Sequence, residues 1–405
     1  MAFSLRRMGR YDLAACLTYI AYSGSSVAVP VVLVEIAGDL NFPLSSGGQG
    51  AGGALQISRS IFMVLAMVLC GFAAGRWGKR LTIGSSVIIM ALGVGLAALA
   101  PSYGVIVLAL AAAGFGEGII EGLATPVIQH LHREDEPGRY INFCHGFWSI
   151  GIVLMTLVTG WLLIKNVSWR YILAGVAGVA LLPALCFLLP EKRRIFNDGA
   201  VDFKTTWLRT KEVLKSGPFW LFFLLMFVGG GAEFGLTFWA SSFVRLNLNG
   251  TAAQGAMTTL IFSVGMIIGR LGSAALIPQK HLFRLLLISA GAGLAVSTAL
   301  PFAGSVLSCQ ALFLLMGVAC APLWPSTQSY CTDRLPRLDS TVVYIVLSCA
   351  GTPGCGVVTW ILGELGDRFT LRYGILAVTV CLALFVGVLV FERLRKGPAA
   401  PPGTK

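Results

Sequence analysis

The chain has 405 residues and a formal net charge of +12 at pH 7; 56% of its residues are hydrophobic and only 12% are charged. Its mean hydropathy is +0.81. Because a soluble domain has about 25% charged residues, this composition excludes an ordinary soluble protein and predicts an all-α membrane protein. No run of Lys and Arg is longer than three residues, so the net charge does not indicate a nucleic-acid partner.

Cysteine and histidine usage argues against metal chemistry. The ten cysteines lie almost all within apolar runs, and no two form a C-x-x-C pair. We interpret them as small apolar residues and expect no metal site or cofactor. The four histidines show no i, i+4 ligand pattern, which argues against an enzyme embedded in the membrane. The first apolar run is too long for the core of a cleavable signal peptide.

Apolar segments of membrane-spanning length follow one another along the whole chain. A span needs about 20 apolar residues at about 1.5 Å per residue. By this measure we predict twelve membrane-spanning helices, at residues 11–35, 50–74, 79–100, 103–130, 139–164, 168–189, 217–245, 251–277, 282–303, 305–331, 340–363 and 371–392.

The basic residues predict how these helices are oriented. If both termini are cytoplasmic, the inner segments hold 23 of the 30 Lys and Arg residues, and the outer segments hold five. The remaining two, Arg59 and Arg270, fall within spans. Cytoplasmic loops of membrane proteins carry such an excess. We therefore expect a multi-pass protein of the cell (inner) membrane with both termini in the cytoplasm.

The longest polar stretch divides the chain into halves. It follows the sixth span and includes an amphipathic segment at 203–215. We predict an N-terminal six-helix bundle at 1–190, a basic cytoplasmic linker at 191–216, and a C-terminal six-helix bundle with a short tail at 217–405. Two pseudo-symmetric bundles are the plan of many secondary transporters.

A polar stripe crosses the fourth span at residues 114–126, GFGEGIIEGLATP. Glu117 and Glu121 are one helical turn apart, and Thr125 extends the same face. Ionisable residues at bilayer depth are costly and are usually functional, so we interpret this stripe as one wall of a solute pathway. The alternative is that both acids are neutral and serve only packing.

Arg59 lies in the second span near the predicted depth of Glu117. An unpaired guanidinium is strongly disfavoured there, so Arg59 needs a partner. One alternative is a fixed ion pair with Glu117. The other is that Arg59 faces the pathway and binds a carboxylate of the solute, which would then be a sugar acid or another organic anion.

Residues 71–83, GFAAGRWGKRLTI, resemble the loop between helices two and three of the major facilitator superfamily, G-x-L-A-D-R-x-G-R-K-x-x-L. Arg76 and Arg80 match basic positions of that loop, whereas its acidic position is Gly75. The resemblance implies the major facilitator fold and a gating role for Arg76 and Arg80.

Four stretches resemble the fucose permease branch, whose members are sugar–cation symporters. They are IEGLATP in span four, RYINFCHGFWSIG in span five, GAEFGLTFWASSF in span seven and GVACAPLWPSTQ in span ten. The resemblance implies roles in solute binding or coupling for Glu121, Thr125, Asn142, His145, Glu233 and Trp239. Span one departs from the branch, because Ser26 stands where a buried Asp precedes the proline.

Further binding residues are predicted from their chemistry. Glu233 follows three glycines and has a carboxylate that can accept two hydroxyl hydrogen bonds. Trp239 and Trp324 are candidates to stack on a sugar ring, with lipid-interface anchoring as the alternative. Gln328 adds a donor and an acceptor one turn beyond Trp324. Arg270 is expected to close a cytoplasmic gate with an acidic loop residue.

Together these features predict a secondary transporter of a small polar solute, a sugar or sugar acid, that works by alternating access. We expect a monomer with proton symport, and sodium as the alternative coupling ion. The acid that is not paired with Arg59 is the better proton carrier, and depth favours Glu121. Alternatives are an organic-anion carrier or a drug or metabolite exporter of the same superfamily, and a non-transporting sensor is disfavoured.

Overall fold

The computed structural model describes residues 8–131, 137–189, 203–277 and 279–395. Within them, twelve helical segments are long and apolar enough to cross a membrane. The predicted number of spans is therefore confirmed, and each observed span overlaps its predicted range.

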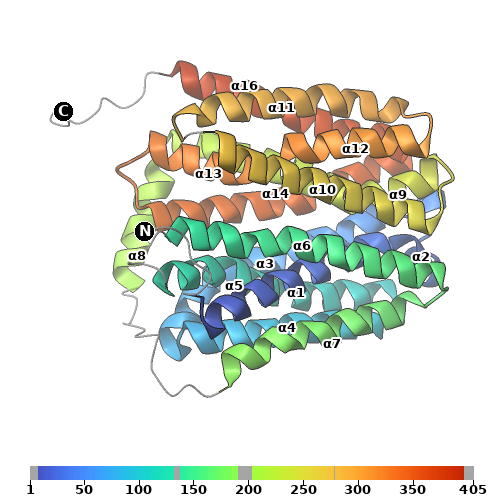
Figure 1. The fold of residues 1–405 in the computed structure, drawn as a ribbon, viewed down its shortest axis with the longest axis horizontal. Helices are drawn as coiled ribbons and strands as arrows, with labels where there is room; N and C mark the ends of the chain where they lie inside the picture. Colours follow the sequence, from blue (N-terminus) through green and yellow to red (C-terminus); the bar gives the residue numbers. More distant parts are fainter. Residues whose placement is uncertain (1–7, 132–136, 190–202, 278, 396–405) are drawn as a thin grey trace.

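The helices form two bundles that lie one above the other in Figure 1. The first contains α1 (Arg10–Val31), α3 (Gln49–Trp77), α4 (Lys79–Ala98), α5 (Tyr103–Leu131), α6 (Pro137–Ile164) and α7 (Trp169–Leu188). The second contains α9 (Phe219–Asn247), α10 (Ala252–Leu276), α11 (Leu282–Ala299), α12 (Val306–Cys320), α13 (Leu323–Arg334), α14 (Ser340–Arg368), α15 (Leu371–Gly374) and α16 (Leu376–Leu394).

Two short helices mark opposite ends of the molecule. Helix α2 (Leu33–Asp39) follows α1, and α8 (Phe203–Lys215) precedes the second bundle, which confirms that residues 203–215 are helical. We call these the α2 end and the α8 end (Figure 1). Helix α8 is attached to the second bundle by an ion pair of 2.7 Å between Arg209 and Asp339.

Proline and glycine decide where spans break or touch. The tenth span, predicted as one helix at 305–331, is split into α12 and α13 at Pro322, because proline lacks an amide hydrogen for the helix ladder. Helix α14, in contrast, continues through Pro353. A side chain at Gly354 would collide with the backbone of Phe227, so this glycine is a packing notch between α14 and α9.

The two bundles repeat a detail that their sequences share. Trp169-Arg170-Tyr171 begins the sixth span and Leu371-Arg372-Tyr373 begins the twelfth. Arg170 donates to the carbonyls of Ala98 and Ala100 at the end of α4, and Arg372 donates to Pro301 after α11. Each arginine therefore caps the third span of its own bundle, as pseudo-two-fold symmetry requires.

The bundles touch along α3 with α14, α6 with α10, and α1 with α9. At the α2 end the two bundles are also joined by hydrogen bonds and an ion pair. Gln49 and Gly50, the first residues of α3, donate backbone hydrogen bonds of 2.8 and 2.6 Å to the carboxylate of Asp367 on α14. Arg245 of α9 forms an ion pair of 2.7 Å with Glu35 of α2. These contacts hold the bundles together at this end.

Asp367 acts as an N-cap supplied by the other bundle, because α3 has no side-chain cap of its own. We expect Asp367→Asn to weaken closure of the α2 end. A lost cap costs about 0.5–2 kcal/mol, so amide exchange in a peptide covering residues 44–56 should become roughly 2- to 30-fold faster. Hydrogen–deuterium exchange with mass spectrometry measures this rate. Glu212→Gln is the control, since Glu212 is exposed on α8 at the opposite end of the molecule. Unchanged protection in Asp367→Asn would contradict the capping role.

Candidate functional site

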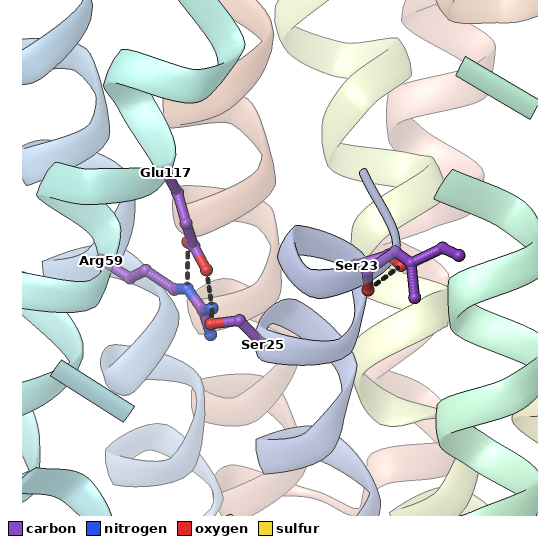
Figure 2. Close-up of polar contacts among 5 residues, drawn as sticks. Ser23, Ser25, Arg59 and Glu117 are labelled. Carbon is purple, nitrogen blue, oxygen red and sulfur yellow. Dashed lines mark hydrogen bonds and ion pairs between the residues drawn. The ribbon is translucent and has the colours of Figure 1, made fainter. Parts of the chain in front are cut away.

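The first component of the site is an ion pair inside the first bundle. Arg59 of α3 donates from Nε to Glu117 Oε2 on α5 at 2.7 Å, and its Nη2 contacts Glu117 Oε1. The same Nη2 donates to Ser25 Oγ on α1 at 2.8 Å. Figure 2 shows Arg59 lying between Glu117 and Ser25. Both charged side chains are buried, with 2% of Arg59 and none of Glu117 exposed.

Close packing of α3 against α5 creates this geometry. Side chains at Gly114 and Gly118 would collide with the backbone of Arg59 and Met63, respectively, so the two glycines let the helices touch. The ion-pair alternative for Arg59 is present in the structure. In this conformation the guanidinium is turned toward Glu117 and Ser25, and it is too buried to meet a solute carboxylate.

Glu121 lies one turn beyond Glu117 on the same helix and is half-buried. It forms no hydrogen bond or ion pair with another residue of the described part of the chain. The Glu121 carboxylate lies within electrostatic range of the Tyr22 hydroxyl of α1 and of the thiols of Cys349 and Cys355 of α14. Glu121 therefore points toward the contact between the two bundles.

Three predicted neighbours of Glu121 cannot be placed in this way. Thr125 lies in α5, and Asn142 and His145 lie in α6, but their side chains are outside the described part of the structure. Their roles in solute binding stay predictions.

The second bundle contains its own ion pair. Arg270 Nη2 of α10 donates to Glu233 Oε1 of α9 at 2.9 Å, and 28% of Arg270 and 17% of Glu233 remain exposed. Arg270 was expected to close a cytoplasmic gate with an acidic loop residue; in this conformation its partner is Glu233 in the adjacent helix, and the gating role stays a prediction. The charge of Glu233 also acts on Cys355, as does that of Glu121. Glu121 and Glu233, which belong to opposite bundles, thus lie within electrostatic range of the same thiol.

Trp324 and Gln328 of the same bundle lie one turn apart on α13. The ring of Trp324 fills the space over Gly230 and Gly351, where a side chain would collide with it, and it is partly exposed. Gln328 donates to Ser348 Oγ of α14 at 3.3 Å. Helices α9, α13 and α14 therefore bring Trp324 near the glycine run that precedes Glu233.

Trp239 lies elsewhere. It is fully buried, and its indole nitrogen donates to the carbonyl of Thr359 at 2.9 Å. Its ring contacts the backbone region of Gly52 and Gly363, so it packs where the bundles meet at the α2 end. Lipid anchoring is therefore wrong for Trp239, and no ring face is open for a sugar in this conformation.

The two arginines predicted to act in gating, Arg76 and Arg80, differ in their surroundings. Helix α3 ends at Trp77, and Gly78 adopts a φ of 81°, a left-handed conformation that favours glycine and permits the tight turn into α4. Arg76 is exposed, whereas Arg80 donates to the carbonyls of Phe187 and Leu189 at the end of α7. In this conformation Arg80 thus caps a helix of its own bundle.

The family model of the Major Facilitator Superfamily matches residues 13–343. The chain belongs to the Major Facilitator Superfamily. The family, together with the twelve spans, makes it a multi-pass membrane transporter and not an enzyme. The superfamily predicted from residues 71–83 is confirmed.

Solved structures of this superfamily share the fold. A D-xylose-proton symporter matches with a TM-score of 0.77 and 15% identity over 96% of this chain and 98% of that one. A bacterial homologue of the human lysosomal transporter Spinster, inward-facing and occupied, has a TM-score of 0.74 and 17% identity over 94% and 96%. The E. coli fucose:proton symporter has a TM-score of 0.65 and 18% identity over 95% and 99%. At these identities the similarity establishes the fold.

One relative is named for multidrug resistance. The multidrug resistance protein MdtH of Aeromonas hydrophila subsp. hydrophila is 26% identical over 184 residues. The match covers 45% of this superfamily member and 44% of the relative, less than half of either chain.

Two contributors to the site were missed by sequence reasoning. Ser25 completes the hydrogen bonding of Arg59, but Ser26 was the position compared with the sugar carriers. Cys355 was grouped with the other apolar cysteines, yet its thiol donates to the carbonyl of Gly230 at 3.3 Å and lies within electrostatic range of both carboxylates. The i, i+4 spacing of Gly351 and Cys355 on one face of α14 was a usable signal for the second.

Proposed function

We propose that this transporter moves a small polar solute, a sugar or sugar acid, together with a proton. The observation that carries the proposal is Glu121: a half-buried carboxyl group at the contact between bundles, with no ion pair among the described residues. A carboxyl group without a cationic partner can be neutral in one conformation and charged in another. Glu117, in contrast, is bonded to Arg59.

Solute binding is assigned to the space between the bundles. Glu233, Trp324 and Gln328 contribute from the second bundle, and Glu121, with Thr125, Asn142 and His145, from the first. Trp324 offers a partly exposed aromatic face for a sugar ring, and the carboxylates accept hydrogen bonds from hydroxyl groups. The solved sugar–proton symporters of the same fold support this class of solute.

We further propose that both termini are cytoplasmic, so that the α8 end faces the cytoplasm and the α2 end faces outward. The distribution of Lys and Arg supports this orientation. Closure by Asp367 and by the ion pair of Arg245 with Glu35 then seals the outer side. Alternating access requires these contacts to break when solute enters from outside.

The test is transport by purified protein in liposomes. The solutes are two matched pairs, D-glucose with D-glucuronate and D-galactose with D-galacturonate, together with L-lactate. With the liposome interior more alkaline by one pH unit, we expect at least one of these solutes to accumulate, and a protonophore to abolish its accumulation. Absence of uptake and of exchange for every solute would contradict the proposal.

A second candidate function is drug or metabolite export, which the similarity to a multidrug resistance protein favours. The same liposomes distinguish the two. An exporter should deplete a lipophilic cation such as ethidium against its gradient, whereas a sugar symporter should not respond to it.

A further inference from the structure

The two ion pairs of the site differ in how completely they are bonded. In the Arg59–Glu117 pair both carboxylate oxygens contact the guanidinium, Ser25 adds a bond, and at most 2% of either side chain is exposed. In the Arg270–Glu233 pair a single nitrogen contacts a single oxygen. The Arg59–Glu117 pair therefore leaves no room for another ligand, whereas the Arg270–Glu233 pair can accept one.

Glu233 Oε2 is buried and has no hydrogen-bond partner in the described part of the structure. A buried carboxylate oxygen without a donor is costly, so this half of Glu233 is set up to receive one. Within the described residues, Arg270 uses Nη2 for Glu233 and Nε for a long bond of 3.4 Å to the carbonyl of Ala321, and no acceptor there is bonded to Nη1. The Arg270 side chain is 28% exposed, so its guanidinium is accessible to another ligand.

We propose that Arg270 binds a carboxylate of the solute, and that Glu233 is paired with Arg270 until the solute binds. The transported solute is then an organic anion, with a sugar acid as the chemical class that uses the remaining groups. The anion replaces Glu233 on the planar guanidinium fork, which matches carboxylate geometry. This inference rests on the proposed transport function and names its substrate class.

Charge balance links anion binding to a proton. Without bound solute, the ion pair of Arg270 and Glu233 has no net charge. A bound carboxylate adds one negative charge inside the membrane, where net charge is strongly disfavoured. One proton, carried by Glu233 or by Glu121, restores the balance. The other titratable groups close to Glu233 are the thiols of Cys320 on α12 and Cys355 on α14. Transport of a monocarboxylate with one proton is therefore electroneutral.

The experiment measures binding of the same matched sugars and acids to the purified full chain, by thermal shift and by titration calorimetry at pH 6 and pH 8. We expect D-glucuronate or D-galacturonate to bind, and its neutral partner sugar to bind at least tenfold more weakly. Arg270→Gln should weaken acid binding roughly 10- to 100-fold. Glu233→Gln should keep acid binding and make it less dependent on pH, since Arg270 then has no competing carboxylate.

Two controls keep the result interpretable. Arg209→Gln removes the same charge from an exposed pair on α8 and should leave acid binding unchanged. The double variant Glu233→Gln with Arg270→Gln contains no unpaired charge, so it tests acid binding where Arg270→Gln alone fails to fold. Acid binding that survives in either variant lacking Arg270 would overturn the inference.

Binding of a neutral sugar without binding of any acid would overturn the inference and leave the transport proposal standing. Absence of binding by every solute would contradict both. In liposomes, uptake of the acid that follows the pH gradient and ignores an imposed membrane potential is the expected result, and potential-driven uptake would overturn electroneutral coupling.

Discussion

Glu121→Gln is expected to abolish accumulation of solute against its gradient while leaving exchange of labelled solute intact. Glutamine keeps the shape of the side chain but cannot carry a proton. With one proton per solute, a gradient of one pH unit supports about tenfold accumulation, because 1.4 kcal/mol corresponds to a factor of ten. The variant should instead reach equal concentrations inside and outside. Uptake into liposomes of whichever sugar or sugar acid binds in the thermal-shift experiment measures the ratio of inside to outside concentration.

The matched control is Glu212→Gln, which makes the same chemical change at an exposed position of α8. It should retain the full accumulation ratio. Exchange of labelled solute in Glu121→Gln shows that the variant is folded and still alternates. Full pH-driven accumulation in Glu121→Gln would remove this residue from the coupling role.

The second large effect concerns stability. Arg59→Gln or Glu117→Gln each leaves a buried charge without its partner, which costs about 3–5 kcal/mol. The double variant, which removes both charges, should recover most of this loss because no charge is left unpaired. Unfolding of the purified protein in detergent, analysed as a double-mutant cycle, measures the coupling between the two residues.

Arg209→Gln is the control here as well. It removes one partner of a pair in which Arg209 is 54% exposed, and exposed pairs contribute only about 0–1 kcal/mol. If Arg59→Gln were as stable as Arg209→Gln, the buried pair would not hold α3 and α5 together. Additive losses in the double variant would contradict direct pairing of Arg59 with Glu117.

In the first bundle, one pairing could be anticipated by counting residues along the sequence. Arg59 and Glu117 were predicted at similar depth from their distances to the ends of their spans, and the structure pairs them. Depth is set by a rise of about 1.5 Å per residue and by the bilayer, so it can be counted along the sequence. Ser25 could not be foreseen, since the rotation of α1 about its axis depends on packing.

The second bundle shows the limit. Arg270 was placed near the inner end of its span and Glu233 near the middle of another, and no rule of spacing joined them. Their contact depends on how α10 lies against α9 and on the long reach of the arginine side chain. The burial of Trp239 between the bundles could not be foreseen for a related reason: an indole near a helix end is equally suited to lipid, solute or an interface between bundles.

The sequence alone determined the membrane class, the twelve spans, the superfamily and the presence of ionisable residues at depth, because hydrophobic length and motif spacing are local properties of the chain. Only the tertiary structure decided that Arg59 is bonded to Glu117 and Ser25, that Arg270 is joined to Glu233, and that Asp367 caps a helix of the opposite bundle. These pairings link residues far apart in the chain, and the helix rotations and close glycine contacts that bring them together arise only from packing.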